Sequence, residues 1–407
     1  MAVKAKAIDI RTEQGRYMQI TGNYAAAYGA KLARPDVVTA YPITPMSSII
    51  EKLSQFVESG EMKSRYIIMD SEHSVMAALI GACETGARTF TATSAQGLAY
   101  MHEMMHWSGR GRMPIVMAVV NRTLGSPSQL GAEQDDILSD FNTGWMMLFC
   151  EYNQEILDSV LLAYKIGEQV GLPVAVVLEG FTTSHTTEPV LVPKQELVDR
   201  FLPVKRTVRY KLDPADPHNF VTCPEMSGPG LMSTFRQRRR IQDAFDLAKP
   251  VAKMAFDEFY RIFGRRYNTI ECVNTDDADV IIVTTQTMAS SARIAMNQAR
   301  KDGKKVGLAK ILMYRPFPTE DLYAAVNKAK KLAVIDRNVA FGHAGVFALE
   351  VKAAMYNHEK RPPVYGFISG LSGTPVTPKI VHEMLDYCYQ HDMPEGDQIW
   401  KGLEPAK

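Results

Sequence analysis

Short apolar runs alternate with helix-like segments through most of this chain, and that alternation limits the folds it can adopt. In the first half, strand patterns occur at residues 37–41, 66–69, 89–93, 115–120 and 174–178, and helical patterns at 24–32, 45–57, 72–87, 97–107 and 153–169. Strands that alternate with helices favour a parallel sheet with helices on both faces. The sequence therefore predicts an α/β fold built on an open parallel sheet.

The alternation stops and then resumes. Residues 207–236 lack clear periodicity and hold four prolines and two glycines, as expected of a long connection. A basic stretch at 236–240 then opens a predicted helix that reaches about residue 263, and strand–helix alternation returns from residue 279. We predict a first domain at 1–206, a linker and connecting helix at 207–264, and a second open parallel-sheet domain at 265–407.

Composition excludes several classes of protein. The 407 residues have a formal net charge of +1, which gives no electrostatic case for a nucleic-acid or anionic-membrane partner. The longest apolar run, at 113–120, is too short to cross a bilayer, and the N-terminus lacks the apolar core of a signal peptide. We expect a cytoplasmic protein without a membrane span.

The five cysteines are far apart in the sequence. This spacing matches neither a disulfide framework nor the CxxC patterns of zinc and iron–sulfur sites. We expect no metal site on this chain.

Polar side chains follow several predicted strands at the point where each strand ends. Thr44 in YPITP follows the first, Glu72 follows the second, Ser94 and Gln96 follow the third, and Arg122 follows the fourth. Ligands of open parallel sheets bind at the carboxyl ends of the strands. We therefore expect these side chains to share one site.

Thr44 has the chemistry of a helix N-cap, with Pro45 at the first helical position. The free N–H groups of such a helix start would attract a carboxylate or a phosphate. A well-capped helix without a ligand remains an alternative.

Two charged residues at this edge suggest chemistry. Glu72 begins an almost uncharged helix, so its carboxyl group should be partly desolvated and able to share a proton with a heterocyclic nitrogen. An acidic residue that simply favours a helix N-terminus is the alternative. The Arg122 guanidinium suits a substrate carboxylate, although an ion pair with one of the acidic residues 135, 136 or 140 would also explain it.

A competing motif occurs at residues 102–106, where His102 and His106 complete the HExxH pattern of zinc hydrolases. The third-ligand position of a metzincin holds Arg112, and Glu133 is only a possible further ligand. Histidines at the helix surface or at a subunit contact explain the pattern better. The zinc hydrolase stays as an alternative of another class.

The ordered set of motifs YPITP, DSEHSVMAALIGA, TATSAQGL, MPIVMAVVNRTL, NTGW, LPVAVVLEGF and MYRPFPTEDL resembles the α subunit of 2-oxoacid:acceptor oxidoreductases, the pyruvate:ferredoxin oxidoreductase family. The resemblance covers nearly the whole chain. It implies the pyrimidine-binding fold of a thiamine diphosphate enzyme, followed by a transketolase C-terminal-like domain.

The resemblance also implies roles for particular residues. Glu72 would hydrogen-bond the aminopyrimidine ring of thiamine diphosphate and promote deprotonation of its thiazolium carbon. Pro42, Ser94 and Gln96 would line the same cofactor. Thr44 would face the 2-oxoacid, and Arg122 would pair with its carboxylate. The implied reaction is oxidative decarboxylation to CO2 and an acyl group that passes to coenzyme A.

This chain lacks the GDG…N motif for diphosphate and Mg2+ and lacks clustered cysteines. The resemblance therefore implies partners: a β subunit that shares thiamine diphosphate and supplies the diphosphate–Mg2+ half-site, and γ and ferredoxin-like subunits that carry iron–sulfur clusters. Ferredoxin or NAD would be the final electron acceptor. The isolated chain should be inactive.

The sequence departs from the pyruvate-type pattern NRALSAPxNIWxDxSD just beyond Arg122, where it reads NRTLGSPSQLGAEQDD. If Leu130, Gly131 and Ala132 line the substrate pocket, the loss of a bulky Ile-Trp pair leaves room for a larger acyl group. We hypothesise an aryl 2-oxoacid, as in phenylglyoxylate dehydrogenase. Pyruvate is the alternative.

Overall fold

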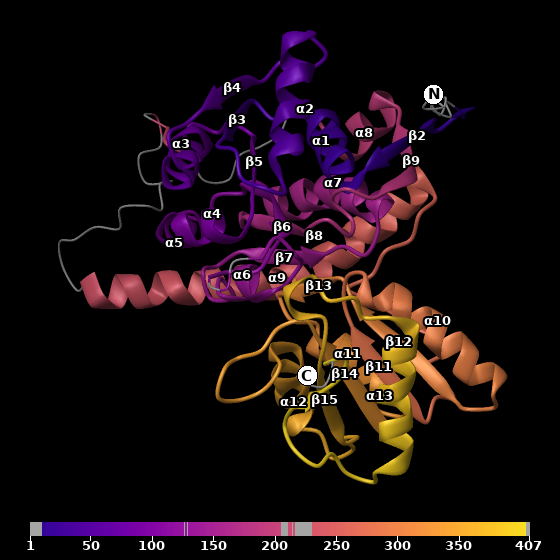
Figure 1. The fold of residues 1–407 in the computed structure, drawn as a ribbon. Helices are drawn as coiled ribbons and strands as arrows, with labels where there is room; N and C mark the ends of the chain where they lie inside the picture. The colour runs from indigo at the N-terminus through magenta and orange to yellow at the C-terminus, as the bar shows by residue number, and fades with distance from the viewer. Residues whose placement is uncertain are drawn as a thin grey trace.

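The computed structural model describes residues 10–125, 127, 129–204, 211–213, 215 and 230–403 (Figure 1). The helices are α1 (Gly22–Ala33), α2 (Ser47–Glu58), α3 (Glu72–Glu84), α4 (Ala95–Tyr100), α5 (His102–Arg110), α6 (Asp135–Leu138), α7 (Asn153–Val170), α8 (Gln195–Phe201), α9 (Gly230–Phe263), α10 (Met288–Lys301), α11 (Thr319–Val326), α12 (Val346–Tyr356) and α13 (Pro378–Gln390), with a 3-10 turn η1 (Leu371–Gly373).

The strands are β1 (Ile10–Arg11), β2 (Gly15–Thr21), β3 (Val37–Ala40), β4 (Arg65–Ile68), β5 (Thr89–Thr93), β6 (Val116–Asn121), β7 (Met146–Phe149), β8 (Val174–Glu179), β9 (Thr187–Pro193), β10 (Ile270–Val273), β11 (Val280–Thr284), β12 (Val306–Ile311), β13 (Met313–Arg315), β14 (Lys331–Asp336), β15 (Val364–Ile368) and β16 (Ile399–Trp400).

A seven-stranded sheet organises the first half of the chain, here called the N-terminal unit. Its order is β13-β7-β8-β6-β5-β3-β4, and every pair is parallel except β13 with β7. Alternate side chains of β6 enter two different cores: Val116, Ala118 and Val120 pack with α1, α2, α7 and α9, and Met117 and Val119 pack with α3 and α5. Burial on both faces explains why the strand reads as a continuous apolar run.

A six-stranded sheet, β10-β12-β11-β14-β15-β16, organises the second half, here called the C-terminal unit. All its pairs are parallel except β10 with β12. Helices α10 and α13 cover one face. The other face, with α11 and α12, belongs to the same apolar core as α3 and α5 of the N-terminal unit, so the two units share a core.

The prediction of two open parallel sheets is confirmed, except that each sheet also has one antiparallel pair. The structure adds antiparallel edge strands β10 and β13 and a separate antiparallel sheet β1-β2-β9. Strand β13 lies in the second half of the sequence but pairs with β7 of the N-terminal unit. Such short edge strands have too few residues to show a period of their own. The domain boundaries given above remain a prediction. Of the connection predicted at 207–236, most of 207–229 lies outside the described residues, and α9 already begins at Gly230, earlier than the predicted start near residue 236.

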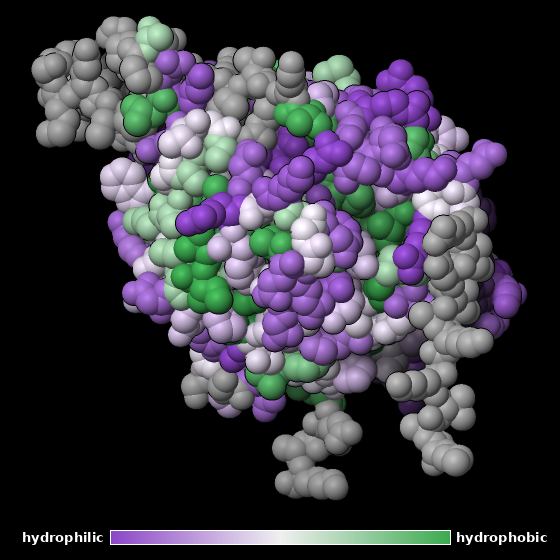
Figure 2. Space-filling view, turned by 90° about the horizontal axis from the view of Figure 1, so that it is seen from above, coloured by the Kyte–Doolittle hydropathy of each residue, from purple (hydrophilic) through white to green (hydrophobic). Residues whose placement is uncertain are grey.

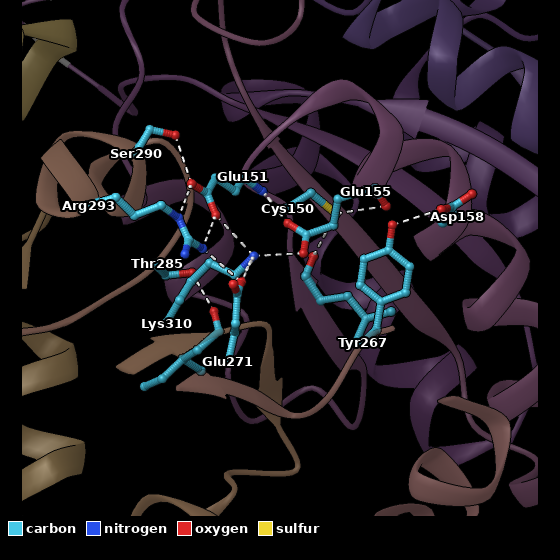
Figure 3. Close-up of polar contacts among 12 residues, drawn as sticks. Cys150, Glu151, Glu155, Asp158, Tyr267, Glu271, Thr285, Ser290, Arg293 and Lys310 are labelled. Atoms are coloured by element: carbon cyan, nitrogen blue, oxygen red, sulfur yellow. Dashed lines mark hydrogen bonds and ion pairs between the residues drawn. The ribbon is translucent and has the colours of Figure 1, made fainter. Parts of the chain in front are cut away.

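Polar groups join the two units around Lys310 of β12, which is almost fully buried (Figure 3). Its Nζ lies 2.8 Å from Glu155 Oε1, 3.1 Å from Glu151 Oε2 and 3.1 Å from Glu271 Oε2. Burial lowers the pKa of Lys310, but the Glu155, Glu151 and Glu271 carboxylates outweigh it and raise this pKa above its usual value. Two of the three carboxylates come from the N-terminal unit, so this ion cluster fastens the units together.

No helix in the described part of the chain is long and apolar enough to cross a membrane. On the face seen in Figure 2, hydrophobic areas lie between hydrophilic ones.

Candidate functional site

The candidate site lies where strands β3 to β6 end. These strands are parallel neighbours, so the segments that follow them meet at one edge of the seven-stranded sheet. The sequence predicted this edge because each strand is followed by a polar segment.

The turn after β3 holds Thr44, but not as a helix cap. Helix α2 begins at Ser47, with Met46 at the cap position and no side-chain cap bond, so the N-cap prediction for Thr44 and the helical position of Pro45 are wrong. Met46 N–H instead donates to the Ile43 carbonyl at 3.0 Å and closes a turn before the helix. This turn leaves Thr44 exposed at the sheet edge.

The side chain of Asn23 in α1 hydrogen-bonds to this turn and to the start of α2. Its Nδ2 donates to the Pro45 carbonyl at 2.7 Å and to Ser48 Oγ at 2.9 Å. Asn23 is fully buried, so these bonds are shielded from water. The position of Thr44 is therefore anchored to the helix layer beneath the sheet.

Arg122 lies beside Thr44. Its Nη1 donates to the Thr44 carbonyl at 2.7 Å and its Nε to the Gln129 carbonyl at 3.3 Å. Neither acceptor carries a charge, and within the described residues the guanidinium forms no ion pair with Asp135, Asp136 or Asp140. The predicted structural ion pair is therefore not formed, and the positive charge faces the Thr44 turn.

Glu72 is the first residue of α3, whose N-cap Ser71 accepts a hydrogen bond from Ser74 N–H. Its side chain is nearly buried, with 7% exposed. A Cβ atom added to Gly97 would lie 2.5 Å from Glu72 Oε1 and 2.7 Å from Thr93 Oγ1. The carboxylate thus lies directly against the backbone of α4, where only glycine leaves space for it.

Several polar atoms at this edge of the sheet have no hydrogen bond within the described residues. Among the described residues, the Glu72 carboxylate has no hydrogen bond, and the buried atoms Gln96 Oε1 and Thr93 Oγ1 have none either. Buried polar atoms without partners are uncommon and call for an explanation. They are suited to bind a polar ring that this chain does not supply itself.

The other two residues predicted at the cofactor lie differently. Ser94 is buried and donates from Oγ to the Val120 carbonyl at 2.7 Å, which links the ends of β5 and β6. Pro42 is exposed in the turn that also holds Thr44.

Asp136 is a central residue that the sequence reasoning did not single out as part of the site. It is almost fully buried, and its Oδ2 accepts from Arg122 N–H at 3.1 Å and from Ala95 N–H at 3.2 Å. Its Oδ1 accepts from Asn121 Nδ2 at 2.6 Å. Burial raises the pKa of Asp136 to about 8. One carboxyl group thus joins the Arg122 segment to the start of α4, next to Gln96 and Gly97.

The segment between Arg122 and Asp136 rests on the C-terminal unit. Leu130 is 45% exposed. A Cβ atom on Gly131 would lie 2.3 Å from the Ser372 carbonyl oxygen, and Gly373 N–H donates to the Ala132 carbonyl at 2.9 Å. The role of Leu130 and Gly131 in a substrate pocket stays a prediction.

The HExxH histidines do not assemble a metal site. His102 Nδ1 lies 2.5 Å from Asp140 Oδ1, and the rings of His102 and His106 meet edge to face. Within the described residues, no group of three or more His, Cys, Asp or Glu side chains is arranged to hold a metal ion.

Two models of known protein families match this chain. Residues 28–256 match the family described as "Pyruvate flavodoxin/ferredoxin oxidoreductase, thiamine diP-bdg", and residues 278–381 match "Pyruvate:ferredoxin oxidoreductase core domain II". These matches cover most of both units. They leave no support for the zinc-hydrolase alternative.

Known proteins agree with this assignment. Ketoisovalerate oxidoreductase subunit VorA of Pyrococcus horikoshii is 45% identical over 90% of this chain and 92% of its own length. Pyruvate synthase subunit PorA of Methanothermobacter thermautotrophicus is 41% identical over 95% of this chain and 98% of its own length.

Two solved structures share the fold. A 2-oxoglutarate:ferredoxin oxidoreductase from Magnetococcus marinus matches 91% of this chain with a TM-score of 0.68 and 20% identity, and this chain spans 65% of that one's length. A split-gene transketolase matches 90% of this chain and 93% of its own, with a TM-score of 0.53 and 14% identity. The resemblance found in the sequence motifs is thus confirmed: this chain belongs to the family of 2-oxoacid:ferredoxin oxidoreductase α subunits.

Proposed function

We propose that this chain is the α subunit of a complex that oxidatively decarboxylates a 2-oxoacid and transfers the acyl group to coenzyme A. The observation that carries the proposal is the meeting of Arg122, Thr44 and the unpartnered Glu72 at one sheet edge. A cation, an exposed hydroxyl and a nearly buried carboxyl group are the groups that this chemistry needs on the protein side.

Thiamine diphosphate fits the unpaired atoms around Glu72. When bound, this cofactor supplies the carbon nucleophile and takes up the electrons released by decarboxylation. Glu72 would exchange a proton with the aminopyrimidine N1′, and Gln96 would accept a hydrogen bond from the same ring. Pro42 and Ser94 would contribute to the wall of the cofactor site, Ser94 mainly by holding β5 against β6.

Arg122 would bind the substrate carboxylate. Its guanidinium carries five N–H donors, and the two protein acceptors are neutral carbonyls, so donors remain for a carboxylate. The Thr44 hydroxyl would face the keto oxygen. Together Arg122 and Thr44 would bind and orient the 2-oxoacid at this edge of the sheet.

For the substrate we propose an aliphatic 2-oxoacid with a branched chain, such as 2-ketoisovalerate. A relative at 45% identity is named for ketoisovalerate, and, if Leu130, Gly131 and Ala132 line the pocket, the absence of the Ile-Trp pair would leave room for a larger acyl group than acetyl. Pyruvate is the second candidate, because relatives at 41–42% identity are named for pyruvate synthase. The relatives named above do not support the phenylglyoxylate hypothesis.

The chain needs partners for this reaction. The relatives are named as subunits, and apolar side chains are exposed around the candidate site: Ile68 is 71% exposed, Tyr100 60% and Trp107 48%. We propose that a β subunit covers this face and contributes the diphosphate–Mg2+ half-site, and that further subunits carry the iron–sulfur clusters that pass electrons to ferredoxin or NAD. The cytoplasmic location and the domain boundaries stay predictions.

The proposal can be tested on the complex obtained by purifying this chain together with its partner subunits. This complex should contain thiamine diphosphate and should reduce ferredoxin with a 2-oxoacid and coenzyme A. Glu72→Gln should abolish turnover without loss of assembly, while Glu51→Gln, at an exposed position of α2, should leave turnover unchanged. Full activity of Glu72→Gln would refute the assignment of the site.

A further inference from the structure

The carboxyl ends of the two main sheets face each other, and side chains of the C-terminal unit reach the substrate segment of the N-terminal unit. Gln286 follows β11 and is fully buried. Its Nε2 donates to Asn121 Oδ1 at 2.9 Å, and its Oε1 accepts from Gln134 Nε2 at 2.6 Å. Asn121 is the last residue of β6, immediately before Arg122. The amide group of Gln286 thus lies between the two ends of the 121–134 segment.

Asn121 connects Gln286, through Asp136, to the backbone of Arg122 and to the start of α4. Its Nδ2 donates to Asp136 Oδ1 at 2.6 Å, and Asp136 Oδ2 accepts from the N–H groups of Arg122 and Ala95. The side chains of Gln286, Asn121 and Asp136 are each at most 1% exposed. In such a setting each hydrogen-bonding group has few alternative partners, so its orientation is fixed by its neighbour.

The other end of the segment, at Glu133 and Gln134, is also held by the C-terminal unit. Gln134 N–H donates to the Arg337 carbonyl at 3.2 Å, and Asn338 Nδ2 donates to Gln134 Oε1 at 3.3 Å. Glu133 Oε2 accepts from Ser372 N–H at 2.9 Å. Glu133 and Gln134 are therefore held in place by loops of the C-terminal unit.

We propose that Gln286 is a positioning residue for substrate binding: it orients Asn121 and, through Asp136, sets the backbone of Arg122 so that the guanidinium meets the substrate carboxylate. The inference rests on the proposed function of Arg122. It gives the C-terminal unit a part in the recognition of the 2-oxoacid, although none of its residues need touch the substrate.

Gln286→Met is the test, made in the purified complex. Methionine has a similar shape but cannot hydrogen-bond, so Asn121 Oδ1 and Gln134 Nε2 lose their partner. Gln298→Met is the matched control, because Gln298 is on α10 of the same unit and its side chain donates to the exposed Asp302 at the surface. For each variant we would measure KM and kcat for the 2-oxoacid, the affinity for thiamine diphosphate and the midpoint of thermal unfolding.

Gln286→Met should raise KM for the 2-oxoacid roughly 10-fold, equivalent to about one weakened hydrogen bond to the substrate carboxylate, with kcat within about threefold of wild type. Gln298→Met should change none of these values. A purely structural role would lower thermal stability and the amount of active complex without moving KM. Unchanged KM in an assembled Gln286→Met complex would overturn the proposal.

A second variant covers failure of the first to assemble. Gln134→Met removes the donor to Gln286 Oε1 from the other side and should raise KM in the same direction. If KM does not move in that variant either, the proposal is wrong. The wild-type complex separates the two claims: absence of any 2-oxoacid turnover contradicts the proposed function, whereas normal turnover with an unmoved KM in the variants contradicts only the role of Gln286.

Discussion

The Arg122 guanidinium donates a 2.7 Å hydrogen bond to the carbonyl oxygen of Thr44, a residue 78 positions earlier in the chain. The bond joins the segment after β6 to the turn after β3, two strands that are separated in the sheet by β5. Within the described residues, no carboxylate forms an ion pair with Arg122. Much of the proposed chemistry depends on this arrangement.

Arg122→Gln should lower kcat/KM for the 2-oxoacid roughly 10- to 100-fold, mainly through KM, because a charge-assisted bond to the substrate carboxylate is lost. Steady-state kinetics of the complex measure this. Arg239→Gln, which removes an exposed arginine paired with Asp243, is the control and should behave as wild type. An unchanged KM in Arg122→Gln would place the carboxylate elsewhere.

Gly97→Ala should impair binding of thiamine diphosphate, because the added Cβ would lie 2.5 Å from Glu72 Oε1 and push the carboxylate out of place. The cofactor that co-purifies with the complex measures the effect. Gly81→Ala in α3 is the matched control: nothing lies within 4 Å of its Cβ, and alanine favours the helix by about 1 kcal/mol. Normal cofactor content in Gly97→Ala would show that the ring binds away from Glu72.

Ionisation of Asp136 should lower the free energy of unfolding as the pH rises. Burial raises its pKa from 3.8 to about 8, so the folded state binds this proton more tightly than the unfolded state does. Its contribution is full below the unfolded pKa and is lost as the pH rises towards the folded pKa, with a slope of about 1.4 kcal/mol per pH unit.

Asp136→Asn should remove that slope. Urea unfolding between about pH 5 and pH 8 compares the variant with wild type, and the difference isolates Asp136 from the other buried acids. Parallel pH profiles for the two proteins would mean that the carboxyl group is ionised in the folded state, held so by its N–H donors.

Lys310→Met should destabilise the protein by about 3–5 kcal/mol, because it leaves the buried Glu155 carboxylate without its cation, whereas Glu151 keeps its ion pair with Arg293. Chemical denaturation measures the change. Lys304→Met removes an exposed pair with Asp386 and should cost less than about 1 kcal/mol. A Lys310→Met protein as stable as the Lys304→Met protein would show that the cluster in Figure 3 does not fasten the units.

The sequence by itself determined the order of the buried strands and the edge at which polar residues gather. Apolar runs such as 116–120 are local signals, and a residue directly after a strand must lie at its carboxyl end, so Thr44, Glu72 and Arg122 could be assigned to one edge in advance. The ordered motifs then identified the family.

Only the tertiary structure decided how that edge is built. Local chemistry made Thr44 a helix cap, but the chain closes a turn at Ile43 and Met46 instead and presents the Thr44 carbonyl to Arg122. The contact of Gln286 with Asn121 spans 165 residues, and no periodicity encodes a pairing over that distance. Strand patterns arise from neighbours in sequence, whereas the orientation of buried polar side chains depends on which surfaces meet when the two units pack.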